Sequence, residues 1–459
     1  EIHSGDWSSD VCSSDLTMTL ELDSYREKVA AMDCMTYQGK VQRMSGSIVE
    51  AHGPSVGVGE LCEILPRDNA RAPIRAEVVG FRDETTILMP LEKLNGIKAG
   101  DPVISSTGDL KVNLGMKLLG RVLDGLGDPI DGGEDIVCPH SAAIYNPAPA
   151  PMERGSIEDP LDTGVRAIDL PLTLGKGQRI GIFAGAGVGK STLLAQVARN
   201  ARADANVIAM VGERGREVRE FIENTLGPEG LEKSVVVVAT ADMPPLLKVK
   251  AAFTSTTIAE YLRDQGLHVL YMMDSLTRVA NSQREIGLAA GEPPTAQGYP
   301  PSVFSLIPEL TERLGNARHG SITGIYSVLV ERDDFTEPVA DAVRASLDGH
   351  IVLSRRLADR GHYPAIDILG SISRLQTEVN GRKELEMSRR LRSIISTYRD
   401  AEDLIKIGAY NKGTSPAIDQ AMELMEEVNE FLQQERTESC CRDAARKKLK
   451  SITDRWNFT

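Results

Sequence analysis

A glycine-rich segment near the middle of the chain has the residue types that bind a nucleotide's phosphates. Its sequence is Ala184-Gly185-Ala186-Gly187-Val188-Gly189-Lys190-Ser191-Thr192. This is the P-loop pattern, with alanine in place of its first glycine. Glycines let backbone N–H groups approach phosphate oxygens, the lysine can reach the β- and γ-phosphates, and the serine hydroxyl can bind Mg²⁺. A strand-like run precedes the segment and a helical pattern follows it, so an ordinary glycine-rich turn explains it poorly.

A second element supplies a carboxylate that could hold the metal. The apolar run Val269-Leu270-Tyr271-Met272-Met273 ends at Asp274. In P-loop proteins, an aspartate at the end of such a strand holds Mg²⁺. Aspartate ends many strands, so the pattern is weak when it stands alone. Beside a P-loop, it predicts that Asp274 is a metal ligand together with Ser191.

A third element could supply a group that acts on water. The segment Gly212-Glu213-Arg214-Gly215-Arg216-Glu217 follows an apolar run at 207–211. If that run is a parallel strand next to the P-loop strand, Glu213 faces the phosphates, because open α/β sheets bind ligands at the carboxyl ends of their strands. A carboxylate there can polarise the attacking water. The alternative is a solvated glutamate stabilised by a helix N-terminus, and the spacing alone supports both interpretations equally.

The elements around these motifs alternate between strand and helix from about 160 to 380. Continuous apolar runs predict parallel strands covered on both faces, and helical patterns between them complete βαβ units. The predicted strands are 179–184, 206–211, 234–240, 268–273, 322–329 and 350–353. The predicted helices include 191–200, 217–226 and 253–265.

The remaining chain divides into four further segments. Residues 1–37 form an N-terminal extension, of which the first 16 are Ser/Asp-rich and unlike the rest, so we interpret them as foreign or disordered. Short β-type runs at 39–41, 46–49, 61–64, 76–81, 86–89 and 102–104 predict a small closed barrel within 38–115. A Gly/Pro-rich linker at 116–159 precedes the ATPase core at 160–380, and a helical domain and tail are predicted at 381–459. We expect the tail after Gln434 to be a solvated helix.

Composition excludes several classes of protein. The 459 residues carry 52 Lys and Arg against 66 Asp and Glu, a net charge of −14, and only 4% are aromatic. This balance disfavours a basic nucleic-acid-binding field and stacking platforms for bases. No apolar run approaches the roughly 20 residues that span a bilayer. The six cysteines are sparse and irregularly spaced, which favours a reducing compartment over a disulfide framework.

The combination of motifs resembles a known family. The segments AGAGVGKST, GERGREVREF, LYMMDSLTR and YPAIDILGSISR are similar to those of the rotary ATPase alpha/beta superfamily. More closely they resemble the type III protein export ATPases, especially the flagellar branch (flagellum-specific ATP synthases), over roughly residues 38–435. The resemblance implies an α/β fold with a RecA-like P-loop core and parallel sheet, preceded by a β-barrel and followed by a helical domain.

The resemblance also implies roles for matching positions. Glu213 would be the catalytic carboxylate, Arg214 its neighbouring organiser, and Arg278 a residue near the γ-phosphate. Arg374, directly after the 364–373 signature, would be an arginine finger that reaches into the neighbouring subunit's site, where a guanidinium can neutralise γ-phosphoryl charge. Tyr363 would pack on the adenine ring, and Tyr410 is a weaker candidate for the same contact.

The implied activity is hydrolysis of ATP, with Mg²⁺, to ADP and phosphate, coupled to unfolding or export of substrate proteins. The implied assembly is a homohexamer, cytoplasmic and peripheral at the inner face of the cell membrane. Its implied partners are export regulator and stalk proteins, export chaperones and substrates, and the export gate, with no specific nucleic acid. The alternatives are a catalytic subunit of a rotary ATP synthase, an injectisome export ATPase, a helicase-like translocase, and a non-catalytic ring subunit. The last would lack a carboxylate at the Glu213 position.

Overall fold

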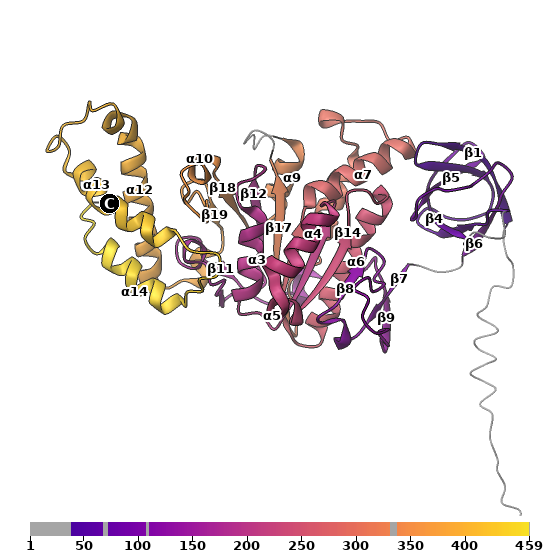
Figure 1. The fold of residues 1–459 in the computed structure, drawn as a ribbon, viewed down its shortest axis with the longest axis horizontal. Helices are drawn as coiled ribbons and strands as arrows, with labels where there is room; N and C mark the ends of the chain where they lie inside the picture. The colour runs from indigo at the N-terminus through magenta and orange to yellow at the C-terminus, as the bar shows by residue number, and fades with distance from the viewer. Residues whose placement is uncertain (1–37, 68–71, 107–109, 331–336, 459) are drawn as a thin grey trace, which may run out of the picture.

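The chain is arranged as three parts along one long axis (Figure 1). The computed structural model describes residues 38–67, 72–106, 110–330 and 337–458. A barrel lies at one end, a mixed α/β part carries the central sheet, and a helical part lies at the other end. The predicted N-terminal extension, 1–37, lies outside the described residues.

The barrel is closed, as the short β-type runs predict. Its strand order is β1-β2-β5-β4-β3-β6, and β6 pairs back onto β1. Alternate side chains such as Val41, Val49 and Val78 point inward to a small apolar core. The strands are β1 (Gln38–Ser45), β2 (Ile48–His52), β3 (Leu61–Ile64), β4 (Ile74–Arg82), β5 (Thr85–Pro90) and β6 (Pro102–Ser106).

The central sheet is mostly parallel and confirms the predicted α/β core. Its order is β19-β18-β12-β17-β15-β13-β14-β8, in which only β19 pairs antiparallel with its neighbour, while β16 pairs antiparallel with β17 off this path. Within the described residues, its strands are β8 (Val122–Asp124), β12 (Arg179–Ala184), β13 (Ala205–Val211), β14 (Ser234–Ala239), β15 (His268–Asp274), β16 (Gly315–Asn316), β17 (Ser321–Leu329), β18 (Gly349–Leu353) and β19 (Ile372–Ser373).

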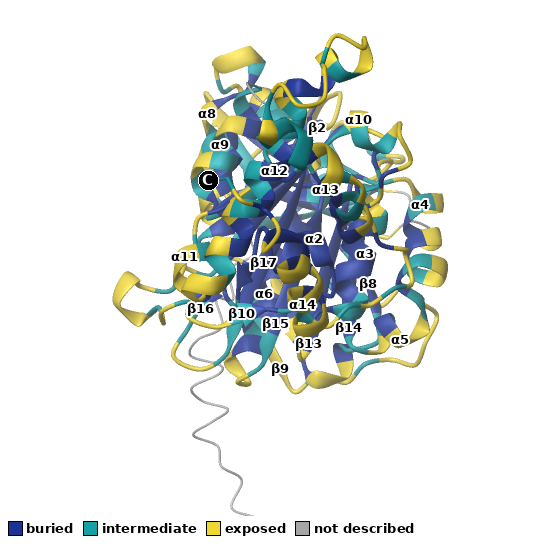
Figure 2. Cartoon of the chain, turned by 90° about the vertical axis from the view of Figure 1, so that its left-hand side faces the viewer, coloured by how far each residue is buried: buried dark blue, intermediate teal, exposed yellow. Residues whose placement is uncertain are grey.

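Both faces of this sheet are buried. Along β13, Val207, Ala209 and Val211 belong to one apolar cluster, whereas Ile208 and Met210 belong to another. This explains why the parallel strands are continuous apolar runs. The strands appear as a buried centre in Figure 2.

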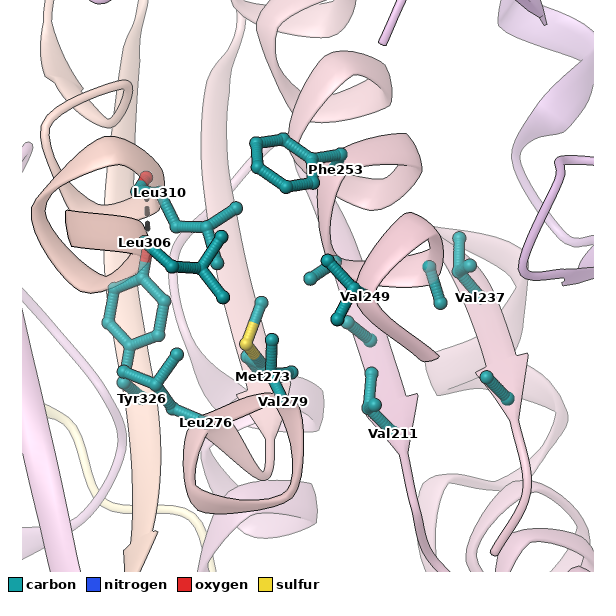
Figure 3. Packing of buried hydrophobic residues seen from close by; sticks show 14 of the residues in the cluster. Val211, Val237, Val249, Phe253, Met273, Leu276, Val279, Leu306, Leu310 and Tyr326 are labelled. Atoms are coloured by element: carbon teal, nitrogen blue, oxygen red, sulfur yellow. Dashed lines mark hydrogen bonds between the residues drawn. The ribbon is translucent and has the colours of Figure 1, made fainter. Parts of the chain in front are cut away.

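Helices α6, α7 and α8 cover one face of the central sheet and pack against its apolar side chains. Figure 3 shows Leu276 of α7 and Leu310 of α8 beside Tyr326 of β17, with Val249 and Phe253 of α6 further along the same apolar cluster. The Tyr326 hydroxyl donates to the Leu310 carbonyl over 3.5 Å. The helices of this part are α3 (Lys190–Asn200), α4 (Gly215–Glu220), η3 (Phe221–Leu226), α5 (Gly227–Glu232), α6 (Pro245–Asp264), α7 (Leu276–Ala290), α8 (Pro301–Thr311) and α9 (Pro338–Ser346).

The segment predicted as a linker, 116–159, is partly a component of the sheet. Its residues Val122–Asp124 form β8, which pairs parallel with β14 at the edge of the central sheet. Strand β7 (Lys111–Leu114), within the range predicted for the barrel, pairs instead with β9 (His140–Ala143). Three-residue strands in Gly/Pro-rich sequence carry little periodicity, so the local pattern does not indicate them.

The C-terminal helices form one packed unit. They are α12 (Arg382–Lys406), α13 (Pro416–Leu432) and α14 (Arg442–Thr453), which pack against one another. The expectation of a solvated tail is wrong, because Ala445, Leu449, Ile452 and Trp456 are buried. Ala445, Leu449 and Ile452 lie on one face of α14 between charged neighbours, and Trp456 follows the end of the helix. Within the described residues, no helix has the length and apolar character needed to cross a bilayer.

Short elements complete the connections. They are η1 (Met116–Leu118), η2 (Pro151–Glu153), β10 (Pro160–Leu161), α2 (Arg166–Asp169), β11 (Leu174–Gly175), η4 (Ala296–Gly298), α10 (Arg355–Ala358) and α11 (Gln376–Val379). Strand β10 pairs with β11.

Candidate nucleotide-binding site

The glycine-rich segment lies between β12 and α3, at the carboxyl end of the sheet. Gly187 and Gly189 have φ angles of +78° and +92°, which side-chain-bearing residues rarely adopt. A Cβ on Gly189 would lie 3.4 Å from the Tyr363 ring, so glycine also keeps this ring close to the loop. The loop leads directly into the N-terminus of α3, which carries free N–H groups and a partial positive charge.

A cavity of about 920 Å³ opens over this loop. It brings together, from four separate stretches of the sequence, most of the predicted site residues. Those that line it are Gly185, Ala186, Gly187, Gly189, Lys190, Ser191, Thr192, Glu213, Arg214, Arg278 and Tyr363. Val188 does not line it, because its side chain is buried in the core beneath the loop.

Three charged side chains converge beside the cavity. The Lys190 ammonium pairs with the Asp274 carboxylate and lies 3.7 Å from Oε1 of Glu213. The Ser327 hydroxyl donates to Oδ1 of Asp274 over 2.7 Å. The side chains of Lys190, Glu213 and Asp274 are 10%, 14% and 6% exposed. The low exposure strengthens their interactions relative to those of surface ion pairs.

The surroundings of Glu213 shift its pKa upward. Burial and the nearby Asp274 carboxylate raise the pKa of Glu213, while Lys190 and Arg278 act in the opposite direction. The preceding residue, Gly212, has φ +76°, and a Cβ there would lie 2.7 Å from Cβ of Arg278. Glycine at this position therefore lets the strand end and α7 approach each other closely.

The strand that carries Glu213 was predicted to lie next to the P-loop strand, and this prediction is wrong. Strand β13 is not next to the P-loop strand β12, because β17 and β15 lie between them. Glu213 nevertheless approaches Lys190, since the long lysine side chain extends across the strand ends toward Asp274 and Glu213.

Asp274 lies beside the cavity without lining it, and Tyr410 and Arg374 lie away from it. Tyr410 donates its hydroxyl to the Ser415 carbonyl and the Asp419 carboxylate in the loop between α12 and α13, so it does not line this cavity, and its contact with adenine stays a prediction. Arg374 follows β19, which pairs with the first residues of β18. The P-loop follows the last residue of β12, which pairs with the last residue of β18. These two positions on β18, beside Arg374 and beside the P-loop, are about five residues apart, or roughly 17 Å along the strand. Arg374 therefore lies at the opposite end of the sheet from its own subunit's P-loop.

The arrangement fits a nucleotide and a hard divalent cation. The open glycine backbone and the N-terminus of α3 suit phosphates. The Ser191 hydroxyl lines the cavity, and the Asp274 carboxylate lies beside it, which are oxygen donors that suit Mg²⁺. Across the described residues, no group of three or more His, Cys, Asp and Glu is placed to hold a metal. Such a site would be completed by substrate oxygens and water, as Mg²⁺ prefers.

One wall of the cavity was not expected from the sequence. The residues that line it come from the end of α13 and the segment that follows: Glu430, Gln433, Gln434, Glu435, Arg436 and Glu438. The backbone N–H of Gln434 donates to the Tyr363 carbonyl over 2.9 Å, and its side-chain amide donates to the Gly164 carbonyl over 2.7 Å.

This wall is fastened to the P-loop part by side chains. Arg166 donates to the Phe431 carbonyl over 2.9 Å and pairs with Glu438, and Gln196 donates to the Glu435 and Glu438 carbonyls. These contacts join residues more than 230 positions apart, so no local pattern could indicate them. Arg355, also unexpected, donates to the Ala186 carbonyl over 3.1 Å.

The P-loop, the acidic strand end and the parallel sheet together define a P-loop nucleoside triphosphatase. Models of three regions match the chain along its length: the β-barrel domain of the ATP synthase alpha/beta family at 41–107, its nucleotide-binding domain at 164–373, and the EscN-type type III secretion ATPase C-terminal domain at 381–451. The chain belongs to the ATP synthase alpha/beta family, in its branch of type III protein export ATPases.

Similar proteins cover nearly the whole chain. The flagellum-specific ATP synthase of Bacillus subtilis is 48% identical over 95% of this chain and 99% of its own length. The type 3 secretion system ATPase of Xanthomonas euvesicatoria is also 48% identical, over 91% and 94%. The assembled ATPase EscN of enteropathogenic E. coli matches with a TM-score of 0.85 at 43% identity, over 90% of this chain and all of that one.

Proposed function

We propose that this export ATPase hydrolyses MgATP in the cavity above its P-loop, within a homohexameric ring that serves flagellar protein export. The observation that carries the proposal is the convergence of Lys190, Asp274 and Glu213 at the carboxyl end of the sheet. A lysine, a metal-binding carboxylate and a carboxylate that can act on water are the groups that phosphoryl transfer to water requires.

The phosphates would be held by the backbone of 185–189, by Lys190 and by Thr192. Ser191 and Asp274 would hold Mg²⁺, which supplies positive charge to the phosphate oxygens when bound. Lys190, which pairs with Asp274, would also donate to the phosphate oxygens of the bound nucleotide. Tyr363, about half exposed beside Gly189, offers its ring to the base.

Glu213 would orient and polarise the attacking water. A carboxylate with a raised pKa is a stronger base than an ordinary glutamate, which favours its action on water. Arg278 lines the same cavity and would approach the γ-phosphate, while Arg214, paired with Glu217 at 3.4 Å, would organise the loop beside Glu213.

Arg374 would act in the site of the neighbouring subunit. Its position at the far end of the sheet argues against a role in its own site, and its exposed side chain is free to enter another subunit. A guanidinium supplied in trans neutralises charge that develops in the transition state and makes hydrolysis depend on assembly.

The solved relatives support part of the proposed assembly. EscN was solved as an assembled ATPase and in complex with its central stalk EscO, which supports an oligomeric ring with a stalk here. Export regulators, chaperones with their substrates, and an export gate would be further partners, at the inner face of the cell membrane. An injectisome ATPase is the second candidate, because relatives of both kinds are 48% identical. Neighbouring genes for flagellar rod, hook or export-gate proteins would support the flagellar assignment.

Replacing the P-loop lysine tests the assignment of the site. Lys190→Ala should lower kcat by at least about 10²-fold, because it removes a charge aimed at the reacting phosphates. Circular dichroism and the thermal midpoint should stay near those of the wild type. Normal turnover in a folded variant would contradict the assignment.

Mixed rings test the finger. Arg374→Ala and Glu213→Gln subunits should each be inactive alone. When they are mixed, some interfaces combine an intact Glu213 with an intact Arg374, so phosphate release should recover. Absence of recovery in rings shown by native mass spectrometry to be mixed would rule out action in trans.

A further inference from the structure

The main chain on both sides of Arg374 is held by buried polar contacts, although its side chain is exposed. Ser373, immediately before it, is 6% exposed, and the Arg374 N–H donates to the Asp348 carbonyl over 3.0 Å. Strand β19 is only two residues long and lies at the edge of the sheet toward the helical part (Figure 1). Ladder pairing over two residues is a weak restraint, so other contacts must fix this segment.

Gln178 supplies the first of these contacts. This side chain is fully buried between β11 and β12. Its amide nitrogen donates to the Ser373 hydroxyl over 3.0 Å and to the Asp348 carbonyl over 3.2 Å, and its oxygen accepts the Gly175 N–H over 2.8 Å. One amide group thus connects the residue before Arg374 with the carbonyl that binds Arg374.

Ser373 extends this connection into the core. Its hydroxyl donates to the carbonyl of Thr173, which is fully buried, over 2.9 Å. The hydroxyl therefore accepts from one buried group and donates to another. Loss of the hydroxyl would leave both groups without this partner while changing the side-chain volume very little.

Arg179 holds the other side of the same connection. Its backbone N–H and its guanidinium donate to the Asp348 carboxylate over 2.9 to 3.3 Å. After the finger, Gln376 donates to the Pro171 carbonyl and the Ser388 hydroxyl, each over 3.0 Å. The segment around Arg374 is thus fastened on both sides, and three of its anchors, Gln178, Asp348 and Arg179, meet at the amino-terminal ends of β12 and β18.

We infer that Gln178 and Ser373 are positioning residues for the Arg374 finger, and that their hydrogen bonds fix the direction in which this arginine enters the neighbouring site. This inference rests on the proposed action of Arg374 in trans. An arginine side chain has several rotatable bonds, so a displaced main chain would move its guanidinium further still. Misplacement by about 1 Å can cost about 10²-fold in rate.

The test begins with Ser373→Ala in the full-length, assembled ATPase. We expect kcat to fall about 10-fold, with KM for ATP within about two-fold of wild type, since the variant's own phosphate loop is intact. Ser255→Ala is the matched control. Ser255 is fully buried in α6, and its hydroxyl bonds the Ala252 carbonyl and the Tyr271 hydroxyl, away from the finger. The control should keep kcat within about two-fold, even if both variants lose similar stability.

Mixing with Glu213→Gln subunits separates a positioning role from a general structural one. In an equal mixture, about one quarter of the ring interfaces join a Ser373→Ala site to an intact finger, so turnover should reach about a quarter of the wild-type value. Without complementation, only the roughly half of the sites that keep Glu213 would work, each at about a tenth of the wild-type rate. Turnover would then stay at about one twentieth of the wild-type value. Gln178→Met, which removes both polar atoms at similar volume, should give the same kinetics and the same recovery.

Three outcomes would overturn the inference. The first is an unchanged kcat in Ser373→Ala. The second is a loss shared equally by Ser255→Ala. The third is no recovery on mixing while the parallel Arg374→Ala mixture recovers, which leaves the proposed finger standing. If neither mixture recovers, action in trans fails and this inference fails with it.

Discussion

At the scale of single residues, the candidate site places one ammonium beside two carboxylates. Lys190 contacts Asp274 directly and approaches Glu213 at 3.7 Å. One ammonium therefore offsets two carboxylates that would otherwise repel each other. The balance of these charges therefore sets the proton affinity of Glu213.

The first residue-scale prediction concerns pH. Burial and Asp274 raise the pKa of Glu213, and the ionised carboxylate is the form that polarises water. As pH falls through this raised pKa, Glu213 takes up a proton and kcat/KM should decline, at a pH above the ordinary range of glutamate. A plot of log kcat/KM against pH measures the position of this acid limb.

Arg278 provides an internal check on that assignment. Because Arg278 lowers the pKa of Glu213, Arg278→Ala should move the acid limb to higher pH in addition to lowering the maximal rate. Arg219→Ala, which removes an exposed partner of Glu223, should leave the limb in place. An acid limb unmoved by loss of Arg278 would show that another group titrates.

At the scale of elements, continuous apolar runs and local motifs allowed the main strands and the P-loop to be predicted. The β12 run from Arg179 to Ala184 matches the predicted strand at both ends, because both its faces are buried and its boundaries are marked locally. Strand β8 and the cavity wall around Gln434 could not be predicted in the same way. Each depends on partners far away in sequence, β14 for the strand and Tyr363 for the wall.

The tail illustrates a different failure. Its apolar residues Ala445, Leu449, Ile452 and Trp456 have helical spacing and could have indicated a packed face. The surrounding Lys and Arg residues, which are mostly exposed, made the segment resemble a solvated helix. For the site, residue types could identify Glu213 and Lys190, but only packing shows that they approach each other from strands that are not neighbours.

The element-scale prediction concerns the end of β13. Gly212→Ala should lower the free energy of unfolding by about 1–3 kcal/mol, because alanine disfavours φ +76° and its Cβ would meet Arg278. It should also lower kcat, since Glu213 and Arg278 would be displaced. Urea unfolding and steady-state turnover measure the two effects.

Gly266→Ala separates backbone strain from this close contact. Gly266 has φ +86° and open space around its Cβ position, so the variant should lose about 1 kcal/mol and keep its kcat. Equal effects of the two variants on kcat would contradict the importance of the contact between Gly212 and Arg278.

At the scale of the whole molecule, a buried ion pair joins the barrel to the nucleotide-binding part. Lys250 of α6 is fully buried and pairs with Glu77 of β4, and it also donates to the Tyr145 hydroxyl. Burial raises the pKa of Glu77 and lowers that of Lys250, so each depends on the other to stay charged. Loss of one partner of this pair should cost more than loss of one partner of the exposed pair between Lys93 and Asp242, which spans the same boundary.

Removal of Lys250 should therefore loosen the molecule as a whole. Lys250→Ala leaves a buried carboxylate unpaired and should lower the free energy of unfolding by about 3–5 kcal/mol near neutral pH. Because the folded-state pKa of Glu77 would then rise further above its unfolded value, the deficit should shrink as pH falls and Glu77 becomes neutral. The double variant Lys250→Met, Glu77→Leu should recover most of the loss, since it removes both charges and keeps the volume. Lys93→Ala, at the exposed pair, should leave the free energy of unfolding unchanged.

Chemical unfolding between pH 5 and pH 8 measures these differences. If the loss of stability in Lys250→Ala did not depend on pH, or if the double variant were no more stable than the single one, lost packing rather than an uncompensated charge would weaken the junction.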